Sequence, residues 1–293
     1  MVVNTGVKVL AKKEQTQKKI NGKLVASQLT AWDIVKISRH PQRPVLQDYI
    51  EHIFSDFIEL HGDRYYSDDH AIIGGFATIA GQKVMLIGHN KGKNTLENIE
   101  RNFAMAKPEG YRKALRLMKL AQRFNLPVVT IIDTPGAFPG IEAEERGQAE
   151  SIAKNITEMA NIEVPIVSLV IGEGGSGGAL GIGVGDRILM LSNAIYSVIS
   201  PEGCASILWR DASFAPDAAE ALNITAHALL RHEVIDEIIF EPGDGAHTDY
   251  QKITAEVKKA ILDNLKTLVN IPTDVLLDKR FEKYSAMGKF QTT

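Results

Sequence analysis

Short apolar runs bounded by glycine or proline recur through the middle of the chain and predict strands. Residues 127–133 and 164–171 are rich in β-branched residues and too short for helices, so they predict strands buried on both faces. Residues 71–78 and 83–88 predict a hairpin through Ala80-Gly81-Gln82. The remaining predicted strands are 187–190, 196–199 and 235–240.

Helical periodicity separates these strands. Apolar pairs repeat every four residues over 48–58 and predict an amphipathic helix. Pro108 opens a predicted helix that runs to Phe124, and further helices are predicted at about 144–160 and 250–268. The polar end after Leu268 is expected to fray. Strands that alternate with helices predict an α/β domain with a largely buried sheet.

Glycine is concentrated behind the second buried strand. Eight of the 24 glycines lie in residues 172–185, where their N–H groups could face an oxyanion, a phosphate or a carboxylate. Tight packing is the alternative, although it explains the adjacent pairs Gly174–Gly175 and Gly177–Gly178 less well. A second glycine and proline turn, 133–140, follows the strand 127–133. The carboxyl ends of parallel strands share one edge, so we expect both turns to face one crevice.

Two nucleotide-binding motifs are disfavoured at this glycine run. Gly172 to Gly177 matches G-x-G-x-x-G, but the match comes late in the chain, and the next acid, Asp186, is too close. No Gly-Lys-Ser or Gly-Lys-Thr follows the glycines, which excludes a P-loop.

Composition limits the choice of partners. The chain has 293 residues and a net charge of −3, which gives no general attraction to nucleic acid or to an anionic membrane. Residues 1–23 carry six lysines against one acid and form a basic arm, for which no nucleic-acid partner is expected. No apolar run is long enough for a membrane span, and we expect a cytoplasmic protein. The single cysteine, Cys204, excludes internal disulfides and a multi-cysteine zinc site.

Nothing in the sequence assigns a catalytic role to the isolated histidines or to the cysteine. The segments His61-Gly-Asp-Arg64 and His40-Pro-Gln-Arg-Pro44, and also His89, are expected to make local hydrogen bonds. Cys204 is expected to be a buried small apolar residue rather than a nucleophile. The residues alone therefore predict an anion-stabilising α/β enzyme without an evident acid, base, nucleophile or metal.

Several long strings resemble one family, the carboxyltransferase α subunits of bacterial acetyl-CoA carboxylase. The resemblance covers about residues 32–268, and the segment before Trp32 matches no pattern of the family. The strings are RHPQRP (39–44), PEGYRKALRLM (108–118), IDTPGAFPG (132–140), EERGQ (144–148), GEGGSGGAL (172–180) and YSVISPEGCASILW (196–209).

The resemblance implies the crotonase-like (ClpP/crotonase) fold, an α/β spiral of ββα units with an N-terminal helical arm. It implies a basic arm at 1–31, a carboxyltransferase domain at 32–270 and a C-terminal tail at 271–293. It also implies that the chain, active only with a β subunit, transfers a carboxyl group from carboxybiotin to acetyl-CoA. The product, malonyl-CoA, enters fatty acid synthesis.

In such a reaction biotin itself acts as the base, which explains the missing catalytic side chains. The resemblance assigns Gly177 and Gly178 to a backbone N–H oxyanion hole for biotin, and Gly136 and Ala137 to the lining of the same pocket. The biotin carrier protein supplies the carboxybiotin, and no metal is expected on this chain. The implied partners are a zinc-ribbon β subunit in an α2β2 heterotetramer, the carrier protein and the ATP-dependent biotin carboxylase.

Two alternatives stay open at this point. A self-sufficient crotonase-type acyl-CoA hydratase or isomerase shares the oxyanion hole but needs acidic side chains over its substrate. A non-catalytic regulator that binds CoA or a nucleotide is suggested by the G-x-G-x-x-G match.

Overall fold

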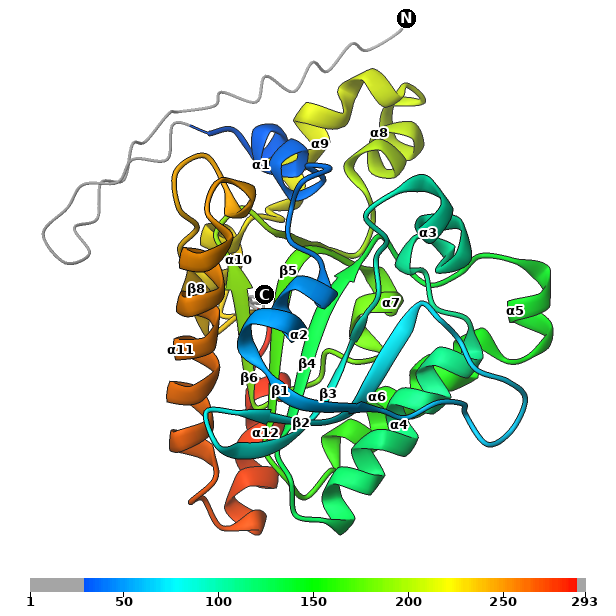
Figure 1. The fold of residues 1–293 in the computed structure, drawn as a ribbon. Coiled ribbons are helices and arrows are strands. Elements are labelled where there is room, and N and C mark those ends of the chain that lie inside the picture. The colour runs from blue at the N-terminus through cyan, green and yellow to red at the C-terminus, as the bar shows by residue number, and fades with distance from the viewer. Residues whose placement is uncertain (1–28, 289–293) are drawn as a thin grey trace, which may run out of the picture.

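One eight-stranded sheet forms the centre of the protein (Figure 1). The structure, a computed structural model, describes residues 29–288. The strands follow one another in the order β1-β2-β3-β4-β5-β6-β8, and β7 pairs with β5. Their bounds are β1 Ser55–Glu59, β2 Ile72–Ile79, β3 Gln82–His89, β4 Val128–Thr134, β5 Ile166–Gly175, β6 Arg187–Leu191, β7 Ile195–Ser197 and β8 Glu237–Ile239.

The sheet combines an antiparallel edge with a parallel centre. β2 and β3 form the predicted hairpin, with Ile79 opposite Gln82, and β1 adds to β2 at the edge. From β3 to β8 all neighbours are parallel, which the alternation of strands and helices predicts. All residues of β4 are buried, as its continuous apolar run requires.

Helices connect the strands. The main ones are α1 Ala31–Ser38, α2 Leu46–Ile53, α3 Thr95–Glu100, α4 Pro108–Arg123, α5 Ile141–Glu145, α6 Gln148–Ala160, α7 Ser176–Leu180, α8 Pro201–Trp209, α9 Ala215–Leu222, α10 Ala226–Arg231, α11 Tyr250–Leu268 and α12 Thr273–Ser285. Three short 3-10 helices are Asn102–Ala104, Ala212–Phe214 and Ala246–Thr248. Within residues 29–288, no helix has the length and apolarity that crossing a membrane requires.

Helices cover both faces of the sheet. Gly74 of β2 lies against Leu117 of α4, whereas Gly88 of β3 lies against Leu46 of α2. Gly74 pairs with Ile87, the neighbour of Gly88, so alternation along the strand places α4 and α2 on opposite faces. Helix α6 packs beside α4, and α11 packs beside α2 (Figure 1).

The predicted helix over 48–58 is wrong in its second half. Helix α2 ends at Ile53, and Phe54 is already extended, with ψ 151°. The residues that continue the helical repeat, Phe57 and Ile58, belong to β1. This strand obtains its hydrogen bonds from β2 across a bulge, a tertiary contact that outweighs the local pattern.

Two further expectations need correction. The helix predicted over 144–160 is divided into α5 and α6 because Gly147 adopts a left-handed conformation, with φ 84°. The C-terminal end is not frayed over Thr273–Ser285, which form α12. Arg280 of this helix is buried and binds both carboxylate oxygens of Asp186 at 2.8 Å. The basic arm lies outside the described residues except for its last three, where Thr30 caps α1.

Candidate functional site

The two glycine turns meet at the carboxyl ends of β4 and β5, as the sequence predicts. A Cβ atom built on Gly178 would lie 2.4 Å from the carbonyl carbon of Gly136 and 2.6 Å from the nitrogen of Ala137. A Cβ atom on Gly175 would lie 2.1 Å from the carbonyl oxygen of Pro135. The structure therefore brings together the four predicted residues, Gly136, Ala137, Gly177 and Gly178.

Packing within the chain explains more of the glycines than expected. Strand β5 continues through Gly175 instead of ending at Ile171, so Gly174 and Gly175 lie in the strand. Neither position has room for a side chain, because Tyr196 and Pro135 lie within 2.7 Å of the added Cβ atoms. The expectation that packing accounts poorly for the adjacent pairs is wrong for Gly174, Gly175 and Gly178.

Gly177 is different from the other seven glycines of the run. An added Cβ atom there has no heavy-atom neighbour closer than 3.7 Å, an ordinary contact with Ile152. At the other seven positions the closest neighbour lies at 2.7 Å or less. Contacts within the described chain therefore do not require glycine at 177.

Three amide groups at the meeting point of the turns are available for a ligand. The N–H groups of Gly177, Gly178 and Ala137 have no hydrogen-bond acceptor among residues 29–288. The N–H of Gly136, in contrast, donates to Thr134 Oγ1 at 3.2 Å. Available backbone donors at a strand-to-helix turn favour a developing oxyanion. The geometry thus supports Ala137 more strongly than Gly136 as a pocket-lining group.

The same turn holds a serine-nucleophile motif that the sequence reasoning wrongly judged to be absent. Gly174 to Gly178 also match Gly-x-Ser-x-Gly, and Ser176 has a left-handed backbone conformation, with φ 49°. Both features are typical of a serine nucleophile on a strand-to-helix turn. No histidine in the described part of the chain hydrogen-bonds the Ser176 hydroxyl, so the structure holds no activated nucleophile there.

A cluster of charges beside the turns was also missed. Lys91 lies 3.5 Å from Asp133 Oδ1 and 3.6 Å from Glu173 Oε1. Arg39 Nε binds Glu173 Oε2 at 2.7 Å, and Arg39 also pairs with Glu202 of α8. Burial disfavours the charge of Lys91, but the carboxylates of Asp133 and Glu173 outweigh it and raise its pKa. Arg39, Asp133 and Glu173 stand in strings that the sequence analysis singled out, but nothing in the sequence indicates that they form one cluster with Lys91.

His89 lies buried at the end of β3, close to the glycine turn. The ring is fully buried, and neither ring nitrogen has a partner at ordinary hydrogen-bond geometry among the residues described, although the Gly178 backbone is a polar neighbour of the ring. Burial lowers the pKa of His89 to about 4, although the Asp133 carboxylate and the Gly178 backbone oppose this shift. His89 is therefore neutral at pH 7.

This buried ring predicts loss of stability in acid. An unfolded histidine titrates at about 6.5, so the unfolded chain binds more protons than the folded chain between pH 6.5 and pH 4. The free energy of unfolding should fall by about 3 kcal/mol as the pH drops through this window. Below pH 4 the titration of His89 should cause no further change. We expect His89→Phe to lose less stability between pH 7 and pH 4.5 in urea unfolding. An equal loss in both proteins would contradict a neutral buried ring.

Three other predicted segments have structural contacts within the chain. Cys204 is buried in α8, as expected. His40 stacks on His247 with a centroid distance of 3.8 Å. Arg43 forms a buried pair with Glu241 and donates to the carbonyl oxygen of Ile171 at 2.7 Å.

Comparisons with known proteins identify close sequence relatives. A family model described as "Acetyl co-enzyme A carboxylase carboxyltransferase-like" matches residues 2–288. A protein of Nitrosomonas europaea is 54% identical over 290 residues, which cover 98% of this chain and 90% of that protein. One of Edwardsiella ictaluri is 56% identical over 264 residues, covering 90% of this chain and 83% of that protein. Both are named acetyl-coenzyme A carboxylase carboxyl transferase subunit alpha.

Solved structures share the fold at low sequence identity. A transcarboxylase 12S structure has a TM-score of 0.62 at 17% identity, covering 90% of this chain and 46% of that chain. A chain of a Pseudomonas malonate decarboxylase hetero-tetramer has a TM-score of 0.61 at 14% identity, covering 75% of this chain and 88% of that chain. These likenesses confirm the expected crotonase-like α/β fold. This chain spans about half the length of the transcarboxylase chain.

Proposed function

The chain belongs to the family of acetyl-CoA carboxylase carboxyltransferase α subunits, and from this premise we propose that its two glycine turns form the biotin side of a shared active site. The relatives' name supports carboxyl transfer to acetyl-CoA over the hydratase, isomerase and regulator alternatives. In this proposal the product is malonyl-CoA for fatty acid synthesis.

The proposal rests on the backbone N–H groups that have no acceptor among the described residues. Backbone N–H groups can stabilise the negative charge that carboxyl transfer would place on the ureido oxygen of a bound biotin. Gly177 and Gly178 would supply these donors, and Ala137 would add a third from the opposite turn. The residues present fit the group, because Gly177 leaves space that the described chain does not fill.

The chain's own residues hold and orient the substrate in this scheme. The bound biotin supplies both the carboxyl group and the base, so the protein has only to place donors. The contact between Gly178 and the Gly136–Ala137 peptide fixes the two turns relative to each other. Donors that are already in place do not have to reorganise when the negative charge develops. This is the main reason why they stabilise the transition state.

A second subunit completes the proposed enzyme. The relatives' name, subunit alpha, implies a multi-subunit complex, and we infer a zinc-ribbon β subunit that binds acetyl-CoA in an α2β2 assembly. The biotin carrier protein would deliver carboxybiotin that biotin carboxylase has made. A cytoplasmic location and the lack of a metal on this chain stay predictions.

A reconstitution assay tests the proposed function. The purified chain is incubated with malonyl-CoA and biocytin, with and without a β subunit of the same family, and release of acetyl-CoA is followed. We expect release only when both subunits are present. Release by the chain alone, or none with a β subunit that is active beside its own α subunit, would contradict the proposal.

A further inference from the structure

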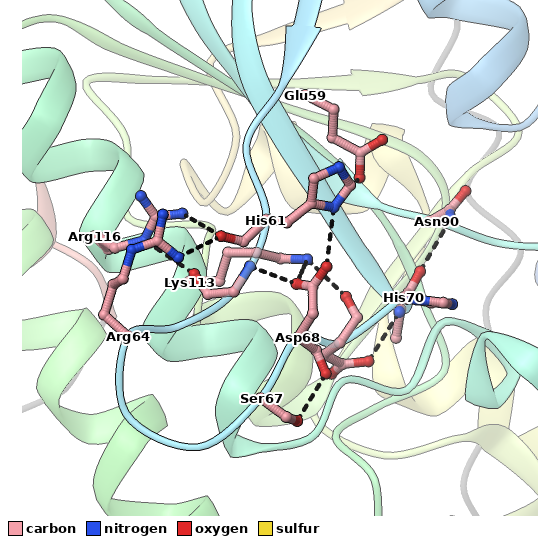
Figure 2. Close-up of polar contacts among 12 residues, drawn as sticks. Glu59, His61, Arg64, Ser67, Asp68, His70, Asn90, Lys113 and Arg116 are labelled. Carbon is pink, nitrogen blue, oxygen red and sulfur yellow. Dashed lines mark hydrogen bonds and ion pairs between the residues drawn. The ribbon is translucent and has the colours of Figure 1, made fainter.

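Two arginines lie side by side on the surface, and neither is paired with a carboxylate of the described residues. Arg64 lies in the loop after β1, and Arg116 lies on α4. Figure 2 shows both guanidinium groups directed at the carbonyl oxygen of His61. Arg64 Nη1 donates to this oxygen at 2.7 Å and Arg116 Nη2 at 3.2 Å, so the two nitrogens are less than 5.9 Å apart.

Neither arginine has a carboxylate partner among residues 29–288. Carboxylates are close, but other groups hold them: Asp63 binds Arg112 at 2.8 Å, and Asp68 binds the buried Lys113. Burial and the like charge of Arg64 lower the pKa of Arg116, against the opposing effect of these two acids. The two positive charges are therefore held together by backbone carbonyls at a cost in repulsion.

The loop geometry is strained at the same place. Arg64 has a φ of 66°, a conformation that is unfavourable for a long side chain. Such strain persists only where the surroundings impose it, and it often marks a functional position. Here it brings the Arg64 guanidinium beside that of Arg116.

Most of the donors in this pair are available. A guanidinium group has five N–H donors. Arg64 uses one, for His61, and Arg116 uses two, for His61 and for Gly62 at 3.0 Å, so seven have no acceptor in the described part of the chain. Paired guanidinium forks match the oxygens of a phosphate group.

We propose that Arg64 and Arg116 bind a phosphate group between their guanidinium forks, as a site separate from the glycine turns. This site does not depend on the proposed carboxyl transfer. Its ligand is a small molecule that carries a phosphate or pyrophosphate group, and it is recognised through charge and through bidentate hydrogen bonds.

Titration calorimetry with pyrophosphate on the full chain tests this site. We expect Arg64→Gln and Arg116→Gln each to weaken binding at least about tenfold, the effect of losing a charge-assisted hydrogen bond. The matched control is Arg123→Gln, which removes the same charge two turns further along the same face of α4. It should change the affinity less than about twofold, since it lies outside the pair. Arg116→Lys, which keeps the charge but not the fork, should still weaken binding.

Two results would overturn the proposal. One is no binding of pyrophosphate by the unmodified chain at millimolar concentration; the other is equal weakening by Arg123→Gln, which indicates general charge attraction. Two further titrations identify the source of the phosphate group. Tighter binding of CoA than of its 3′-dephospho form supports this site as a contact for the 3′-phosphate of CoA. Equal binding of CoA and its 3′-dephospho form, together with competition between inorganic phosphate and pyrophosphate for the site, supports a free phosphate ligand.

Discussion

Replacing Gly178 with alanine should reduce carboxyl transfer by at least about 10²-fold, the typical effect of losing one oxyanion-hole donor. The added Cβ atom would lie 2.4 to 2.8 Å from the backbone of Gly136 and Ala137. Backbone atoms cannot move aside as the end of a flexible side chain can, so the two turns must separate. The amide of Gly178 would then no longer point where the proposal requires. Turnover of malonyl-CoA by the reconstituted enzyme measures this effect.

Two further variants separate positioning from general damage. Gly185→Ala is a matched packing control at the far end of the run, where the added Cβ atom meets Ser168 Oγ at 2.7 Å. It should lower stability but reduce transfer much less than Gly178→Ala. Gly177→Ala keeps its N–H group and fits within the chain, but its Cβ atom would enter the space proposed for biotin, so we expect transfer to fall while the stability of the chain alone stays unchanged. Near-normal turnover of Gly178→Ala, with an intact complex, would contradict the assignment of this amide.

Replacing Arg43 with methionine should lower the free energy of unfolding by about 3 to 5 kcal/mol, because it leaves the buried charge of Glu241 unpaired. Arg43 and Glu241 bind through two hydrogen bonds, at 2.8 and 2.6 Å, with side chains that are 4% and 0% exposed. Glu241 also accepts N–H groups from Asn193 and Ala246, so it cannot turn towards solvent without breaking them. Urea unfolding measures this loss.

A double variant shows whether the unpaired charge is the cause. Arg43→Met with Glu241→Met should be more stable than Arg43→Met alone, since an apolar pair avoids the uncompensated carboxylate. A loss below about 1 kcal/mol for Arg43→Met would contradict burial of this pair, because exposed ion pairs contribute that little. Arg43 belongs to the family string RHPQRP (39–44). Its structural role there is to support β5, through the hydrogen bond to the carbonyl oxygen of Ile171.

The sequence predicted those elements that carry a local pattern, either helical periodicity with a start signal or a continuous apolar run such as those of β4 and β5. The hairpin of β2 and β3, the helix opened by Pro108 and helix α11 all lie close to the predicted bounds. Strand β1 was missed because its hydrogen bonds come from β2. Helix α12 was missed because Arg280 must reach Asp186, 94 residues earlier in the chain. Contacts between distant segments leave no periodic signal.

The site was predictable to a similar extent. Gly177, Gly178, Gly136 and Ala137 were identified by resemblance, and the structure places them together. The sequence could not show that the Gly136 N–H is bonded to Thr134 while the Ala137 N–H is available. It also could not show that Gly177 alone in the run is not required by packing.

The most direct test of the central claim is a crystal structure of the complex with a β subunit and biocytin. The account predicts that the ureido oxygen of biotin lies about 2.7 to 3.1 Å from the amide nitrogens of Gly177 and Gly178. A ureido oxygen bound elsewhere, with these two N–H groups facing solvent or the partner chain, would contradict it.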